Sequence, residues 1–173
     1  MRIARMAAAC LPVFMAAGCG YHVAGRADLL PKDLKTIAIP AFGNNTTRSQ
    51  LARLLPEDIA REFISRTRYR VVADPAQADA VLTGAVINAF AYPTTLDQAS
   101  GRATAAQLGV TLQLTFTDRK TGAVIWSQPA AGFRERYEIS LDPSKYFDES
   151  SPAMIRLSRD VARDVVTSIL EKF

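Results

Sequence analysis

The sequence predicts an α+β fold, a two-layer sandwich in which two helices pack on one face of a mixed four- to five-stranded sheet. Apolar and polar residues alternate along 105–118, as they do in a strand with one buried face. Two other segments, 51–66 and 152–169, repeat apolar residues every three or four positions, which is typical of amphipathic helices. These elements are enough for one sandwich domain, which we place at 35–173.

The N-terminal half of this domain is predicted to contain a strand, a helix and a second strand. The first strand covers 35–42 and is followed by a polar turn at 43–47. Pro56 falls inside the helical pattern, so the helix either kinks there or begins there, with Glu57 and Asp58 at its positive end. A short strand is expected at 68–72. The buried stripe of the helix is predicted to consist of Leu51, Leu54, Leu55, Ile59 and Phe63.

The C-terminal half is predicted to form a three-stranded meander and a last helix. The segment 80–92 is apolar on both faces in places, which predicts a central strand, and 105–118 pairs with it. A hairpin loop at 118–122 leads to a return strand at 123–139, with a bend or bulge at 130–132. The threonine and glutamine face of 105–118 should point away from the helices. The last helix has Pro152 in its first turn, and its predicted buried face consists of Met154, Leu157, Val161, Val165 and Ile169.

Residues 1–18 are predicted to be a lipoprotein signal peptide that is cleaved. Arg2 and Arg5 precede an apolar run at 6–17, which is too short to span a membrane and fits a secretory signal. The small residues at 16–18 stand directly before Cys19 and resemble a lipobox, in which the cysteine is acylated and the chain is cut before it. The alternative is an ordinary signal peptide that leaves a free thiol at Cys19.

Residues 19–34 are predicted to be a lipidated tether on the periplasmic side of a membrane. Gly20 stands where aspartate retains many lipoproteins at the inner membrane, so the known sorting rule implies the outer membrane. No apolar run after Cys19 reaches membrane length, so attachment depends on the acyl chains. Because Cys10 leaves with the signal peptide, the mature chain has no second cysteine for a disulfide bond.

The charge and the reactive residues exclude several classes of function. The net charge falls from +4 to +2 when Arg2 and Arg5 are removed, which argues against nucleic-acid binding. His22 is the one histidine, and it lies in the tether, so neither a metal site nor a Ser–His–Asp arrangement is expected. No glycine-rich phosphate loop is present, and no cofactor is predicted. We therefore predict that the chain is not an enzyme, although a carboxylate pair drawn from Asp97, Asp148 and Glu149 is the open alternative.

Positive charge and aromatic surface are predicted to meet at one end of the sheet. In a meander, the loops at 93–104 and 142–151 lie at the same end, together with the outgoing part of 123–139. Cations beside aromatic surface suit an amphiphile with an anionic head and apolar tails. The alternative is that the strand cations are solvated and paired with Glu135 or Glu138, and that the loop cations are merely exposed. The candidate residues are Arg102, Lys145, Arg134 and Arg136, with Tyr92, Tyr146 and Phe147 beside them.

Two segments of the chain, 18–25 and 36–46, resemble the lipopolysaccharide-assembly lipoprotein family LptE. The order of the predicted elements is also similar, so the resemblance covers essentially the whole mature chain. It implies an outer-membrane lipoprotein that plugs the LptD β-barrel, helps to assemble it and assists lipopolysaccharide on its way to the cell surface. It also implies that basic loop residues contact lipopolysaccharide, for which Arg102 is the first candidate and Lys145 the second.

A rival hypothesis from another class is a lipoprotein that regulates a peptidoglycan synthase or a secretion pore. Such proteins share a strand that ends in Ile-Pro-x-Phe, as at 39–42, before Asn-Thr and a helix. A protein that reaches the cell wall needs a long disordered linker. Here only about a dozen residues separate Cys19 from the first strand, which favours the LptE interpretation.

Overall fold

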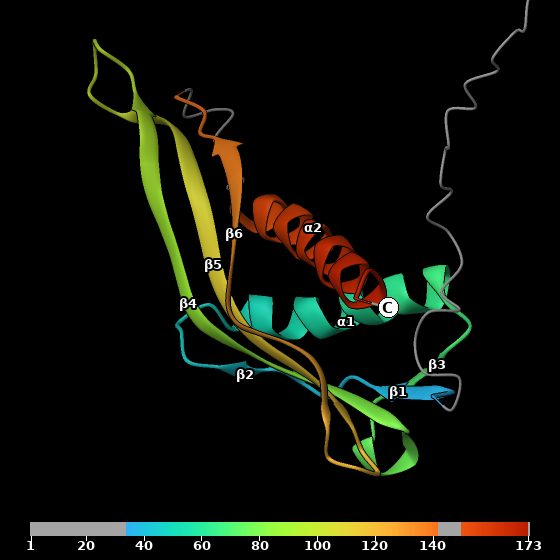
Figure 1. The fold of residues 1–173 in the computed structure, drawn as a ribbon. Coiled ribbons are helices and arrows are strands. Elements are labelled where there is room, and N and C mark those ends of the chain that lie inside the picture. Colours follow the sequence, from blue (N-terminus) through green and yellow to red (C-terminus); the bar gives the residue numbers. More distant parts are fainter. Residues whose placement is uncertain (1–33, 142–149, 173) are drawn as a thin grey trace, which may run out of the picture.

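The computed structural model describes residues 34–141 and 150–172, which form a sheet with two helices against it (Figure 1). The predictions for residues 1–33, including the signal peptide, Cys19 and the tether, therefore lie outside the described residues, as does Lys145. The elements are β1 (Thr36–Ala38), β2 (Gly43–Asn44), α1 (Ser49–Arg66), β3 (Arg70–Val72), the 3-10 helix η1 (Pro75–Gln77), β4 (Ala80–Leu96), β5 (Ala103–Asp118), β6 (Val124–Glu138) and α2 (Ser150–Leu170).

The sheet is mixed and has six strands in the order β3-β1-β4-β5-β6, with β2 also paired to β4. The three short strands pair in parallel, and β4, β5 and β6 form an antiparallel meander. The predicted α+β class is confirmed, although the sheet has more strands than the four to five that were expected. The prediction that the segment at 80–92 is central is also confirmed, because β4 lies between β1 and β5.

The first strand and its turn differ from the prediction. β1 ends at Ala38 rather than at Phe42, and 43–44 is a strand on β4 where a polar turn was expected. The Phe42 ring explains this course, because it packs so closely on Gly84 that a Cβ there would lie 2.7 Å from the ring. With Phe42 held against β4, the next residues continue alongside that strand.

The β4–β5 hairpin is longer than predicted. β4 continues to Leu96 and β5 begins at Ala103, so the loop expected at 93–104 shrinks to 97–102. The pairing passes through Pro93, which lies opposite Ala106. Proline is tolerated there because this part of β4 has β5 as its one neighbour in the described sheet, which leaves the other side of the strand open.

Both helices bury the faces that the spacing predicted. Leu51, Leu55, Ile59 and Phe63 of α1 are fully buried, and Leu54 is half-buried. Pro56 lies in the interior of α1, so the interpretation in which the helix begins at this proline is wrong. In α2, Pro152 does lie in the first turn. The predicted face of α2 is buried throughout, and it is wider than expected, because Ala153, Ser158, Ala162 and Val166 are buried as well.

A buried polar contact joins the two helices. Asp58 of α1 is 4% exposed, and its Oδ2 accepts a hydrogen bond of 2.6 Å from the Ser158 hydroxyl of α2. Arg61 contacts the other carboxylate oxygen. Because both oxygens are satisfied, the carboxylate can be buried without the cost of an unpaired charge.

The sheet bends where two bulges flank the middle of β5. β4 carries an extra residue, Ile87, between Val86 and Asn88. On the other side, β6 carries one extra residue between Gln128 and Ala131, which confirms the predicted irregularity near 130–132. Bulges bend a strand and increase its twist. Beyond them, 88–96, 103–111 and 132–138 extend as a three-stranded projection, which we call the distal arm (Figure 1); the remaining described residues form the body.

Candidate functional site

The register of the three long strands places two rows of side chains on the outer face of the distal arm, the face turned away from the helices. In the first row, Phe90 lies opposite Gly109, which lies opposite Arg134. In the second row, Tyr92, Gln107 and Arg136 are aligned in the same way. Side chains two residues apart in a strand share a face, so the rows are neighbours and form one surface. We call these six residues the arm surface.

The aromatic part of the arm surface is closely packed. The rings of Phe90 and Tyr92 are stacked, with centroids 5.8 Å apart and an interplanar angle of 17°. Phe90 also covers Gly109, where a Cβ atom would lie 2.3 Å from the ring, so this packing requires glycine. The Tyr92 hydroxyl donates a hydrogen bond of 2.5 Å to Oε1 of Gln107. Tyr92 is nevertheless 41% exposed, which leaves an aromatic surface open to a ligand.

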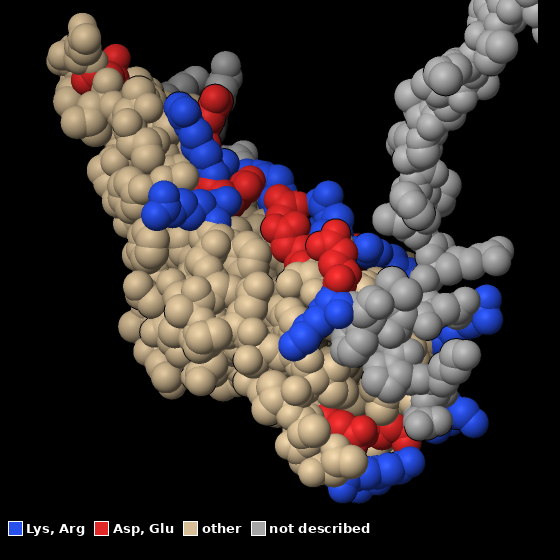
Figure 2. Space-filling view, viewed as in Figure 1, with Lys and Arg blue, Asp and Glu red and all other residues tan. Residues whose placement is uncertain are grey.

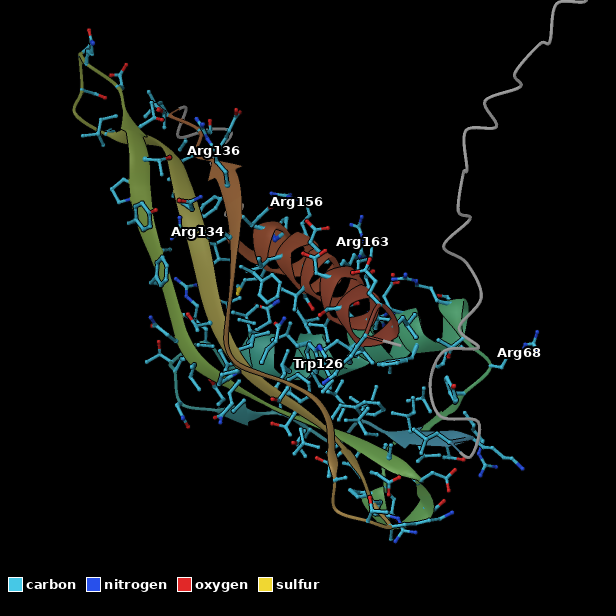
Figure 3. All side chains as sticks on the ribbon, viewed as in Figure 1. Arg68, Trp126, Arg134, Arg136, Arg156 and Arg163 are labelled. Carbon is cyan, nitrogen blue, oxygen red and sulfur yellow. The ribbon has the colours of Figure 1, made fainter. Side chains whose placement is uncertain are left out.

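The cationic part consists of Arg134 and Arg136, which are exposed on β6 (Figure 3). Arg136 reaches across the sheet to the Thr95 hydroxyl at 3.5 Å, a long contact. Glu135 points to the opposite face and pairs with Arg156 of α2 at 2.6 Å. The alternative that Glu135 neutralises the two arginines is therefore wrong. Glu138 forms no ion pair with either arginine among the described residues, so the two guanidinium groups are available to an anion.

Arg134 also lies near acidic side chains of α2, at the edge of the sheet. It borders a polar hollow of about 520 Å³ between β6 and α2, together with Asp160, Arg163 and Asp164. The two carboxylates offset part of the positive charge there. Arg136 is farther from this hollow along the strand and does not line it. We therefore expect Arg136 to attract an anion more strongly than Arg134 does.

Arg102 lies at the tip of the distal arm. The turn is built by Asp97, whose Oδ1 accepts hydrogen bonds from the hydroxyl and the N–H of Ser100, and these bonds lower the pKa of Asp97. Gly101 supplies the positive φ of +67° that closes it. The Arg102 guanidinium then donates to the Leu141 carbonyl at 3.4 Å. The tip therefore lies beside the end of the β6 segment, as the meander predicted.

The three predicted cations that the structure describes, Arg102, Arg134 and Arg136, do not form one cluster. Arg136 lies opposite Gln107 of β5. Gln107 is five residues after Arg102, so the main chains of Gln107 and Arg102 are about 17 Å apart. The structure thus brings Arg134 and Arg136 together beside Tyr92 and places Arg102 farther out. Lys145, Tyr146 and Phe147 lie outside the described residues. Sequence reasoning missed Phe90, Gln107 and Gly109, although the aromatic pair at positions 90 and 92 signals a shared face once the strand is recognised.

The outer face of the body differs from the helical face in its charge. The rows between the bulges and the hairpin end consist of uncharged residues, including Thr83–Thr115–Ser127 and Ala85–Gln113. The exposed face of α2 instead carries ions of both signs. Figure 2 shows the charged side chains as a band that crosses the molecule beside a broad uncharged surface. The charged positions of α2 are Arg156, Arg159, Asp160, Arg163 and Asp164.

Two chemical features are absent from the part of the chain that the structure describes. No three histidine, cysteine or acidic side chains among residues 34–141 and 150–172 lie close enough to hold a metal ion. Neither α1 nor α2, the two described α-helices, is long and apolar enough to cross a membrane.

Comparison with known proteins gives one family. The family model LptE, described as lipopolysaccharide-assembly, matches residues 34–169, which is most of the chain. Comparison with curated protein sequences gives no match.

Solved structures share the fold. The solution structure of lipoprotein B from Nitrosomonas europaea is 14% identical, with a TM-score of 0.55, and the match covers 85% of this chain and 88% of that chain. The rare lipoprotein B from Shewanella oneidensis is also 14% identical, with a TM-score of 0.51, over 79% of this chain and 95% of that chain. At these identities the similarity is one of fold.

Proposed function

This chain belongs to the LptE family of lipopolysaccharide-assembly proteins, and from that premise we propose that it is an outer-membrane lipoprotein that plugs the LptD β-barrel and assists lipopolysaccharide transport to the cell surface. The observation that carries the proposal is the family match over residues 34–169. Acylation of Cys19 would hold the protein on the periplasmic side of that membrane, as the lipobox-like residues before it indicate.

The outer face of the body supports a role as a plug. Threonine, serine, glutamine and asparagine side chains can hydrogen-bond to the polar lining of a barrel. They do so without the desolvation cost that lysine or carboxylate side chains would bring. The long β4–β5–β6 surface presents such residues row after row. The ions on α2 suit contact with water or with charged groups of the partner.

The distal arm supports contact with lipopolysaccharide, an amphiphile with anionic phosphate groups. Arginine binds phosphate through charge-assisted, often bidentate hydrogen bonds. The stacked rings of Phe90 and Tyr92 offer apolar surface on the same face as Arg136, with Gln107 of β5 between Tyr92 and Arg136. We therefore assign the head group to Arg134 and Arg136, and propose Arg102 and Lys145 as further contacts at the tip.

Affinity purification tests the partner. The tagged lipoprotein would be purified from detergent-solubilised membranes at high salt, and the proteins that accompany it would be identified. We expect a large β-barrel in a one-to-one ratio. Recovery of a peptidoglycan synthase or a secretion pore would instead establish the rival function. Recovery of no partner would contradict the proposal that the protein plugs a β-barrel.

Charge reversal tests the lipid site. The double variant Arg134→Glu/Arg136→Glu should bind lipopolysaccharide at least about a hundredfold more weakly, because two charge-assisted contacts are lost and each is worth about 1.5–3 kcal/mol. A matched control is Arg68→Glu/Arg70→Glu, which makes the same change in charge and spacing at exposed positions of the body. The control should bind within about twofold of the natural chain. Equal losses in both variants would show that net charge, and not the arm surface, governs binding.

A further inference from the structure

An open apolar groove runs along α1 on the side away from α2. Its volume is about 600 Å³, and it is bounded by α1, by the chain that follows β1 and by β3. Its floor and its β3 side include Ile39, Phe42, Val71 and Val72. This groove lies in the body and is separate from the arm surface.

The α1 wall of the groove is a second apolar stripe of that helix. Ala52, Pro56, Ala60 and Ile64 follow one another at intervals of four residues and all line the groove. Such residues share one helical face. Ile64 is 61% exposed and continues the apolar stripe of the groove. The first apolar stripe of α1 is buried in the core. The second is only partly covered, because Ala52 and Ala60 pack in part against the core, whereas Ile64 is exposed.

The β3 wall of the groove is an open sheet edge. Among the described strands, β3 pairs with β1 alone. The Arg70 N–H donates to the Lys35 carbonyl and the Val72 carbonyl accepts from Ile39, each at 3.0 Å. In a parallel ladder, successive residues direct their N–H and C=O groups to opposite sides of the strand. Val71 lies between Arg70 and Val72, so it directs these groups away from β1. The N–H and C=O of Val71 therefore face the groove, and no residue in the described part of the chain bonds to them.

We propose that the tether docks in this groove, with residues 26–30 adding an antiparallel strand to β3. An unpaired sheet edge beside an apolar wall is the arrangement that binds an extended peptide, through main-chain bonds to the edge and side chains on the wall. Leu29 and Leu30 supply the apolar side chains. Adjacent residues of a strand point to opposite faces, so one of the two leucines meets α1 in either register.

The tether is the proposed occupant because the described chain begins beside the groove. Leu34 is buried, and the next residue, Lys35, accepts the Arg70 N–H at the start of β3. The tether thus leaves the fold next to the groove. Crossing from β1 to the far side of β3 takes two strand spacings, about 9.6 Å. Residues 31–33 can span about 10 Å, and Pro31 suits a turn.

The direction of the tether and its effective concentration at the groove both support the tether as the occupant. A chain that arrives at the start of β1 from beyond β3 must run opposite to both strands, because β1 and β3 are parallel. The tether is also covalently attached, so its effective concentration at the groove is in the millimolar range. Docking would shorten the free tether and keep the membrane anchor on the β3 side of the domain.

Site-specific photo-crosslinking in the membrane-bound, full-length mature protein tests this inference. A benzophenone amino acid at Ile64 should link to residues 26–33 of the same chain, as identified by mass spectrometry. The same group at Ser65, exposed but turned about 100° away around the helix, should not. Capture of a second copy, of another protein or of lipid from position 64, or no capture, would overturn the proposal.

A variant of the tether provides a second test. Leu29→Asp/Leu30→Asp should lower the crosslink from position 64 at least about fivefold and should speed hydrogen exchange at the Val71 amide about tenfold, since that amide loses its partner. Both residues precede the described fold, so the unfolding temperature of the body serves as the folding control. An unchanged crosslink yield or an unchanged Val71 exchange rate would overturn the proposal.

Discussion

The body and the distal arm are built from the same three long strands, but they bury very different amounts of apolar surface. In the body, the space between the sheet and the two helices is filled with apolar side chains. Leu82, Leu114 and Phe116 of the sheet, for example, are fully buried. Along the arm, the helix-facing residues of β4 are small or exposed, including Ala89, Ala91 and Pro93. The bulges lie where the helix-facing side changes from large buried residues to small or exposed ones.

This difference separates stability from binding. Burial of apolar area supplies most of the favourable free energy of folding, so the body holds the fold. The arm can then expose aromatic rings and unpaired arginines without endangering the core. Under the proposed function, the same meander would therefore serve two purposes, one on each side of the bulges.

The largest effect should come from matched leucine truncations in the two regions. Leu55 is fully buried between α1 and the sheet, whereas Leu96 at the end of β4 is 57% exposed. Leu55→Ala should lower the free energy of unfolding by about 2–5 kcal/mol, because it leaves a cavity. Leu96→Ala should change it by less than about 0.5 kcal/mol. Denaturant unfolding measures both, and similar losses would show that the arm contributes to the core after all.

An intermediate effect is expected at the contact between the helices. Ser158→Ala removes the donor to Asp58 and leaves a buried carboxylate oxygen unsatisfied, which should cost about 1–3 kcal/mol of unfolding free energy. Ser65→Ala, at an exposed hydroxyl of α1, is the control and should be nearly neutral. A neutral Ser158→Ala variant would mean that water can replace the hydroxyl at the interface of the helices.

The smallest effect should be a pH dependence of the body. Asp79 accepts main-chain hydrogen bonds from Lys35 and Thr36, and these bonds, with Lys120 nearby, lower the pKa of its carboxyl group. A lowered folded-state pKa contributes stability that is present above the usual value of 3.8 and is lost as the pH falls below it. Asp79→Asn should flatten the stability curve below about pH 4. Thermal unfolding at pH 3 and pH 7 measures the change, and an unchanged slope would contradict the role of Asp79.

The predictions from sequence were most accurate where periodicity decides the outcome. The orientation of the buried faces of α1 and α2 and the alternation of β5 were correct, because helical and strand periods place side chains on faces without reference to distant residues. Element ends were less accurate. β4 and β5 extend past the predicted loop because each supports the other through their pairing, which local sequence does not encode.

The candidate site shows the same division. Arg134 and Arg136 were proposed from the sequence because the predicted return strand carries them toward the loops at one end of the sheet. Their neighbours Phe90, Gln107 and Gly109 were missed, because register across three strands depends on bulges that no local pattern located in full. The pairing of Glu135 with Arg156 on the opposite face was likewise decided by helix packing.

The sequence by itself determined the class of the fold, the central strand, the inward face of each long element and the candidate cations of β6. Only the tertiary structure decided that β2 joins the sheet, that Ser158 meets Asp58 across 100 residues, and that an open sheet edge borders a second apolar stripe of α1. The reason is physical. Periodicity is a property of a few neighbouring residues, whereas register, bulges and uncovered edges arise from contacts between residues far apart in the chain.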